Sequence, residues 1–130
     1  MSLDLPVRTL APEKLRGFAH LFASVRYSFA GLTRLLGEAA FRHEIVLGIV
    51  LIGTLAAADA STLALLVQGG LLLLLAATEA LNTAIELIVD RVSPEISAFA
   101  GQAKDLGSFA VFCVLVLNLG FAAACLASFV

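Results

Sequence analysis

Three long apolar stretches dominate the pattern of hydrophobic and polar positions along the chain. They cover about residues 39–58, 62–90 and 106–130. A helix needs roughly 20 residues to cross a bilayer at a rise of about 1.5 Å per residue, and each stretch reaches that length. The pattern therefore predicts an all-α, polytopic membrane protein with three transmembrane helices.

The second stretch is longer than a membrane requires. As a helix, residues 62–90 would measure roughly 43 Å, against about 30 Å for the hydrocarbon layer. Asp59 and Ser61 stand just before it, and both are residue types that cap helix N-termini. We expect the last turns of this helix to reach the membrane interface and the water beyond.

A different pattern precedes the first stretch. Apolar residues recur there at spacings of three and four, the period of a helix with one apolar face. They are Leu15, Phe18, Phe22, Val25, Phe29 and Leu32. We predict an amphipathic interfacial helix over 13–36, with its basic residues near lipid headgroups. Residues 1–12, which contain Pro6 and Pro12, are expected to be a disordered extension, and 13–130 a single membrane domain.

Composition excludes a soluble protein. The chain is 61% hydrophobic and 14% charged, whereas soluble domains carry roughly 25% charged residues. Its mean hydropathy is +1.04. A soluble core of 130 residues could not hide so much apolar surface. Cys113 and Cys125 fall within an apolar run, which indicates that they serve as small hydrophobic residues. Their spacing is not that of metal ligands.

The basic residues predict the orientation in the membrane. All of them precede or open the first span, or lie between the second and third. They are Arg8, Lys14, Arg16, Arg26, Arg34, Arg42, Arg91 and Lys104. Because Lys and Arg collect on the cytoplasmic side, the N-terminus and the 91–105 connection are expected in the cytoplasm.

One acidic stripe interrupts the second span. In EALNTAIELIVDRV, Glu79, Asn82, Glu86 and Asp90 follow one another at steps of three, four and four, which places them on one helix face. An ionised carboxylate near the membrane centre costs about 2.5 to 3.5 kcal/mol, and neighbouring carboxylates repel each other. A metal ion, a basic partner or protonation would each compensate.

Two further polar groups are expected at the same depth. In GEAAFRHE, Glu38 precedes Arg42 by four residues, a spacing that predicts a helical ion pair, and Glu44 follows. Acidic residues from two spans at one level suggest a shared divalent-cation site. In AKDLGS, Lys104 and Asp105 stand where the third span begins, and a helix N-terminus beside a cation suits phosphate.

These residues alone leave the activity open. Metal or proton transport also uses carboxylates inside the membrane. The sequence contains no GxxxxGK[ST] loop and none of the protein-kinase motifs. Any chemistry on nucleotides must therefore use another scaffold.

The polar motifs resemble a known family. EALNTAIELIVDRV, followed by SPE and AKDLGS, together with RYSFAGL and GEAAFRHE upstream, is similar to the bacterial integral-membrane diacylglycerol kinases and their undecaprenol kinase relatives. The resemblance covers the chain from about Gly17 onward. It implies homotrimers with shared active sites in the bacterial inner membrane, which use Mg²⁺ and transfer the γ-phosphate of ATP to diacylglycerol, giving phosphatidic acid.

The resemblance also implies roles for single residues. Glu79 would be the general base, with Asn82 as a polar organiser, and Glu38 and Glu86 would hold the metal. The nucleotide would be lined by Tyr27, Glu38, Glu86, Glu95, Lys104 and Asp105. The lipid substrate would lie near Arg42, Glu44, Glu79 and Ser108.

The chain departs from the family pattern on the nucleotide side. Ile96 and Ser97 stand where relatives commonly carry Tyr-His, so an imidazole contact is missing, and His20 stands where a relative carries Arg. GEAAFRHE is more similar to the diacylglycerol branch than to the undecaprenol branch. The alternatives are an undecaprenol kinase and, in a different class, a small metal or proton transporter.

Overall fold

The computed structural model describes residues 16–128, which form four α-helices and no strand. The helices are α1 (Phe18–Leu36), α2 (Ala39–Ala57), α3 (Thr62–Val92) and α4 (Ala98–Ala127). The predicted extension 1–12, and the first residues of the predicted interfacial helix, lie outside this range. The all-α architecture expected from the apolar pattern is confirmed.

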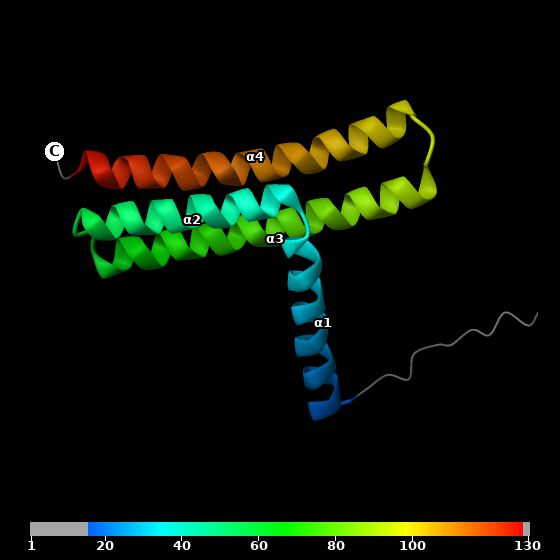
Figure 1. Ribbon diagram of the computed structural model, residues 1–130, viewed down its shortest axis with the longest axis horizontal. Coiled ribbons are helices and arrows are strands. Elements are labelled where there is room, and N and C mark those ends of the chain that lie inside the picture. The colour runs from blue at the N-terminus through cyan, green and yellow to red at the C-terminus, as the bar shows by residue number, and fades with distance from the viewer. Residues whose placement is uncertain (1–15, 129–130) are drawn as a thin grey trace, which may run out of the picture.

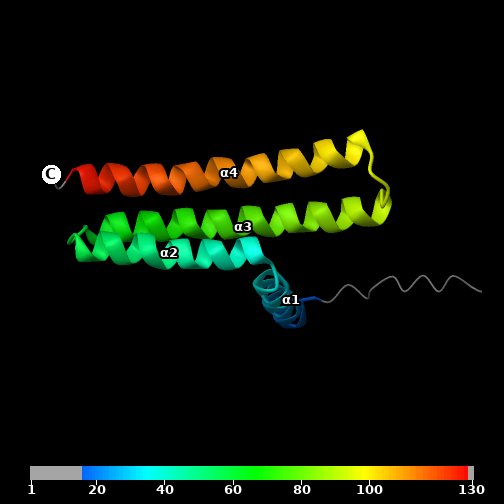
Figure 2. The ribbon, with the colours of Figure 1, turned by 45° about the horizontal axis from the view of Figure 1, so that its top comes forward.

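Three helices run side by side and the fourth leaves them at a steep angle (Figures 1 and 2). α2, α3 and α4 form the bundle, and α3 and α4 share the most extensive contact. α1 departs where α2 begins, partway along α3 (Figure 1). Past this corner, α3 and α4 continue without α2 to the 93–97 connection, and we call this part the two-helix arm.

α1 keeps its apolar face away from the bundle. It begins after Gly17, whose φ of 66° is a conformation that glycine adopts without steric penalty. Phe18, Phe22 and Phe29 are 82%, 74% and 66% exposed. Leu35, near its C-terminal end, is the buried residue of this helix. A helix attached at one end with an exposed aromatic face has the form expected for one lying in a membrane interface.

The three predicted spans correspond to three helices of the bundle. α2, α3 and α4 are each long and apolar enough to cross a membrane. Most of their large apolar side chains are exposed on the single chain, as lipid-facing or subunit-facing residues are. α4 begins at Ala98 rather than near 106, because Ser97 ends the connection and its Oγ accepts a hydrogen bond from the Ala100 N–H.

The turn between α2 and α3 follows the expected capping. The Ser61 side chain accepts a hydrogen bond from the Ala64 N–H at 3.2 Å. Asp59 does not cap in this way. It adopts a left-handed φ of 54°, which Asp tolerates better than most residues, and so reverses the chain direction.

A buried amide pair joins α3 to α4 inside the bundle. Gln68 and Asn118 are both 0% exposed, and the Gln68 Nε2 donates to Asn118 Oδ1 at 2.9 Å. The Asn118 Nδ2 in turn donates to the backbone oxygens of Leu71 and Val114. Because unpaired amides are costly in apolar surroundings, this network fixes the register of the two helices.

We predict that Asn118→Leu destabilises the bundle by about 1 kcal/mol, because it leaves the Gln68 amide buried without a partner. Unfolding of the purified protein in mixed micelles, followed by circular dichroism, measures the effect. The double variant Gln68→Leu/Asn118→Leu removes both amides and should recover much of the loss. A single variant as stable as the unsubstituted protein would contradict the role of the pair.

Candidate functional site

Four carboxylates gather where α1, α2 and α3 meet. Glu79 is almost fully buried, at 5% exposure. The charges of Glu86 and Glu38 lie close enough to repel that of Glu79, and Glu79 acts on Glu44 in the same way. We call Glu38, Glu44, Glu79 and Glu86 the acidic cluster. Acidic residues from the first two spans thus do lie at one level.

Only the rim of the acidic cluster has a cationic partner within residues 16–128. Arg34 forms an ion pair with Glu38 at 2.5 Å, and both side chains are partly exposed. In the same range, no ion pair or protein hydrogen bond engages the Glu79 carboxylate. Several carboxylates with so little compensation need a bound cation or protons.

The predicted ion pair between Glu38 and Arg42 is wrong. Glu38 is the N-cap of α2 and has extended backbone dihedrals, so helical i, i+4 geometry does not apply to it. The Arg42 Nη1 instead donates to the carbonyl oxygens of Leu36 and Gly37, at 3.0 and 2.8 Å. These carbonyls end α1 and are among the acceptors that a helix leaves free. Arg42 therefore braces the corner between α1 and α2.

Asn82 links two turns of the acidic stripe. Its side chain is buried, and its Nδ2 donates to Glu86 Oε1 at 3.1 Å. The spacing of four residues along α3 brings these groups together. The Asn82 Oδ1 is buried without a hydrogen-bond partner in the part of the chain that the structure describes. Asn82 thus orients the Glu86 carboxylate.

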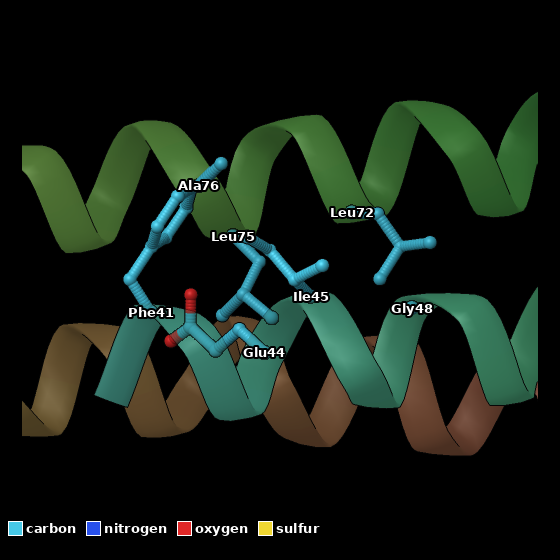
Figure 3. A pocket seen from close by; sticks show the side chains of 7 residues that line it. All are labelled: Phe41, Glu44, Ile45, Gly48, Leu72, Leu75 and Ala76. Atoms are coloured by element: carbon cyan, nitrogen blue, oxygen red, sulfur yellow. The ribbon is translucent and has the colours of Figure 1, made fainter. Parts of the chain in front are cut away.

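Glu44 projects into a small apolar cavity between α2 and α3 (Figure 3). The cavity measures about 140 Å³ and is lined by Phe41, Glu44, Ile45, Gly48, Leu72, Leu75 and Ala76. Within the described residues, Glu44 Oε2 is buried and lacks a hydrogen-bond partner. An unsatisfied acceptor facing an apolar cavity suits a ligand that carries both a hydroxyl group and hydrocarbon.

A second, more polar cavity lies at the end of the two-helix arm. It measures about 240 Å³ and is lined by Asp90, Ser93, Pro94, Glu95, Ile96, Ser97, Ala100, Gly101 and Lys104. Lys104 and Asp90 form an ion pair across the arm at 2.5 Å, with side chains 40% and 62% exposed. The expectation that Lys104 and Asp105 lie at a helix N-terminus is wrong, because α4 starts at Ala98 and already includes them.

Glu95 is held by a chain of hydrogen bonds on the wall of this cavity. The Ser93 hydroxyl donates to Glu95 Oε1 at 2.9 Å, and Ser93 and Ser97 are joined at 3.0 Å. Its own backbone N–H, and after it the Ser93 hydroxyl, lower the pKa of Glu95 below the ordinary value. Ser97 thus both caps α4 and supports the Ser93–Glu95 contact.

Three predicted site residues are not joined to these cavities within one chain. Tyr27 on α1 is 64% exposed, with the Arg26 guanidinium 5.6 Å from its ring centre. Asp105 and Ser108 are exposed on α4. None of the three lines the apolar cavity into which Glu44 projects, here called the Glu44 cavity. None of them lines the polar cavity of the two-helix arm, here called the Lys104 cavity.

The donor set fits a magnesium ion that is completed by phosphate. Within residues 16–128, no three His, Cys, Asp or Glu side chains are grouped closely enough to hold a metal by themselves. Mg²⁺ is usually bound by one or two carboxylates together with water and substrate phosphates. Glu38 and Glu86 offer such oxygens, and Asn82 already orients the second of them.

Comparison with known proteins places the chain in a family. The sequence model described as prokaryotic diacylglycerol kinase matches residues 26–126. The chain belongs to the prokaryotic diacylglycerol kinase family. It is 50% identical over 111 residues to a diacylglycerol kinase of Sinorhizobium sp., covering 85% of this chain and 81% of the relative.

More distant diacylglycerol kinases match over a similar length. The one from Haemophilus influenzae is 37% identical over 105 residues, 80% of this chain and 89% of the relative. The one from Escherichia coli K12 is 38% identical over 104 residues, 78% and 84% of the two chains. The family assignment drawn from the polar motifs is confirmed.

Sequence reasoning missed two contacts at the kinase-family site. One is the ion pair between Asp90 and Lys104, and the other is the support of Glu95 by Ser93 and Ser97. The short connection between the second and third spans was a signal for the first, because it brings the helix ends together. The spacing S-P-E-I-S, with serines on both sides of Glu95, was a weaker signal for the second.

We predict that Ser93→Ala raises the pKa of Glu95 toward the ordinary value, because it removes one of the two hydrogen-bond donors that favour the charged form. Titration of the carboxyl carbon by NMR measures this. Ser24→Ala, on exposed α1, is the control and should leave the Glu95 titration unchanged. An unaltered Glu95 pKa in Ser93→Ala would contradict the contact.

Proposed function

We propose that the protein is an ATP-dependent diacylglycerol kinase that transfers the γ-phosphate of ATP to the free hydroxyl of diacylglycerol, giving phosphatidic acid. The observation that carries this proposal is the burial of Glu79 within the acidic cluster of a family member. The relatives described above bear the name diacylglycerol kinase. This favours the diacylglycerol branch over undecaprenol kinase, and it favours a kinase over an ion transporter.

Glu79 is the proposed general base. Its carboxylate takes the proton of the lipid hydroxyl as the hydroxyl oxygen forms a bond to the γ-phosphorus. The bond from that phosphorus to the bridging oxygen breaks, and ADP leaves. Phosphoryl transfer of this kind depends mainly on positioning and charge stabilisation, with little covalent participation by the protein. A buried carboxylate that forms no ion pair with any residue of 16–128 suits the role of a base.

Glu38 and Glu86 are the proposed metal-binding residues. Asn82 orients Glu86 and Arg34 orients Glu38, so each carboxylate has one supporting contact. A bound Mg²⁺ would neutralise charge on the phosphate oxygens. Because the charges of both residues act on Glu79, metal-bound phosphate and the lipid hydroxyl would meet near Glu79.

The cavity of the two-helix arm is the proposed nucleotide site. Lys104 and Glu95 line it, and the Lys104–Asp90 ion pair is largely exposed. Exposed pairs contribute little stability, so Lys104 can exchange Asp90 for a phosphate group at small cost. Glu95, fixed by Ser93, is placed to accept hydrogen bonds from a ligand hydroxyl or amino group.

The remaining predicted residues support a shared site in a homotrimer. Tyr27, Asp105 and Ser108 are exposed on one chain, although the family resemblance assigns the first two to the nucleotide and Ser108 to the lipid. A neighbouring subunit packed against the exposed apolar faces of α2 to α4 would bring such residues to the site. The Glu44 cavity, close to the Arg42 corner, is the proposed place of the lipid headgroup.

We place the reaction at the cytoplasmic face of the bacterial inner membrane, with the N-terminus in the cytoplasm. The basic residues on one side of the spans support this orientation. The acidic cluster, the α1 corner and the arm then share the side on which ATP is present.

Labelled ATP, Mg²⁺ and each candidate lipid, supplied to the purified protein, test the proposal. Label in phosphatidic acid supports it. Label only in a polyprenyl phosphate would identify an undecaprenol kinase instead. Absence of transfer to either lipid, together with ion flux across liposomes, would overturn the kinase assignment.

We predict that Glu79→Gln abolishes turnover, because the amide cannot accept the hydroxyl proton, while nucleotide binding is largely retained. Steady-state rates and binding of a non-hydrolysable ATP analogue separate the two effects. Asp59→Asn, in the turn that precedes α3, is a matched control that removes a carboxylate elsewhere. Turnover of Glu79→Gln near the unsubstituted rate would show that another group is the base.

A further inference from the structure

The side-chain amide of Asn82 is packed tightly between α3 and α4. Gly107 on α4 is buried directly opposite. A Cβ atom at residue 107 would lie 2.3 Å from the Asn82 Oδ1 and 3.4 Å from its Cγ. Real Cβ atoms do not approach other atoms to 2.3 Å. The amide therefore occupies the space that any side chain at residue 107 would need.

We propose that Gly107 is a positioning residue of the kinase site, which admits the Asn82 amide and thereby sets the Glu86 carboxylate toward the cation. This inference rests on the function proposed above, since it assigns Glu86 a metal-binding role. Gly107 acts through Asn82 and has no contact with substrate of its own.

The two ends of the Asn82 amide explain how Gly107 affects the position of the Glu86 carboxylate. Oδ1 faces Gly107, and Nδ2 donates to Glu86 Oε1 at 3.1 Å. The reverse orientation would turn Oδ1 toward the carboxylate, where two acceptors would meet without a proton between them. Moving Oδ1 away from α4 must therefore also move Nδ2 away from Glu86.

The fold itself can accommodate a methyl group at residue 107. The close contact involves the end of a rotatable side chain, whereas the nearest Asn82 backbone atom, Cα, would be 3.9 Å away. Alanine also favours a helix interior more than glycine does. We therefore expect Gly107→Ala to fold with the Asn82 amide displaced.

The two other glycines of α4 supply matched controls. A Cβ at Gly101 or Gly120 would meet no atom within 4 Å. Gly101 lines the cavity of the two-helix arm, so Gly120 is the better control. Gly120→Ala makes the same change in the same helix, away from both cavities.

The test measures cation binding directly, with Mn²⁺ as the probe. The full chain in lipid bicelles is titrated with Mn²⁺ in the presence of a non-hydrolysable ATP analogue, and free Mn²⁺ is followed by electron paramagnetic resonance. We expect Gly107→Ala to weaken binding roughly 10- to 100-fold, the usual effect of losing a residue that orients a metal ligand. Gly120→Ala should bind as the unsubstituted protein does.

A second pair of variants separates positioning from a structural role. In an Asn82→Ala background the collision is absent, so adding Gly107→Ala should not weaken Mn²⁺ binding further. The proposal would be overturned if Gly107→Ala weakened Mn²⁺ binding further in the Asn82→Ala background. It would also be overturned if Gly107→Ala alone bound Mn²⁺ as the unsubstituted protein does, or if it failed to fold. If the unsubstituted protein phosphorylates no lipid, the proposed function fails instead, whatever Gly107→Ala does.

Discussion

An ionised carboxylate costs about 2.5 to 3.5 kcal/mol at the centre of a bilayer, and this chain buries Glu79 among three others. The repulsion among these four carboxylates is the constraint on which the arrangement depends. Within the described residues, the ion pair at this cluster joins Arg34 to Glu38 at its exposed rim, and Arg42 holds the corner of α1 and α2 through the Leu36 and Gly37 carbonyl oxygens. Protons or a cation would relieve the remaining repulsion, and the Mg²⁺ proposed above would do so while it binds the phosphates.

Two buried contacts fix the register of α4 against α3, the helix that carries Glu79 and Glu86. Near the far end of the bundle, Gln68 and Asn118 pair through their amides, and nearer the corner Asn82 lies against Gly107. The first contact is a pair of hydrogen-bonded amides, and the second is an amide seated against a residue without a side chain. A slip by one residue would disrupt each of them, so both fix an interface that uniform apolar packing would leave free to slide.

The sequence predicted the helices better than it predicted their contacts. Spans of apolar residues are set by bilayer thickness, so three bundle helices and the exposed face of α1 could be foreseen. The spacing also predicted that Asn82 and Glu86 share a helix face, where the structure joins them by a hydrogen bond. The partner of Glu38 could not be read in this way, because it depends on Glu38 being a cap residue rather than a helical one. The Lys104 partner depends on where α4 starts, which Ser97 decides by a single hydrogen bond.

The separation of the two cavities follows from the geometry of the helices. α2 reaches only as far as the corner with α1, whereas α3 and α4 continue beyond it (Figure 1). The Glu44 cavity is therefore lined by apolar residues of the bundle, and the Lys104 cavity by polar residues of the two-helix arm. In the proposed reaction a lipid reaches the first from the bilayer and a nucleotide reaches the second from water. α3 carries residues of both, and its acidic stripe runs from Glu79 to Asp90. In the proposed reaction, a triphosphate with its cations would extend along this stripe from Lys104 to the lipid hydroxyl beside Glu79.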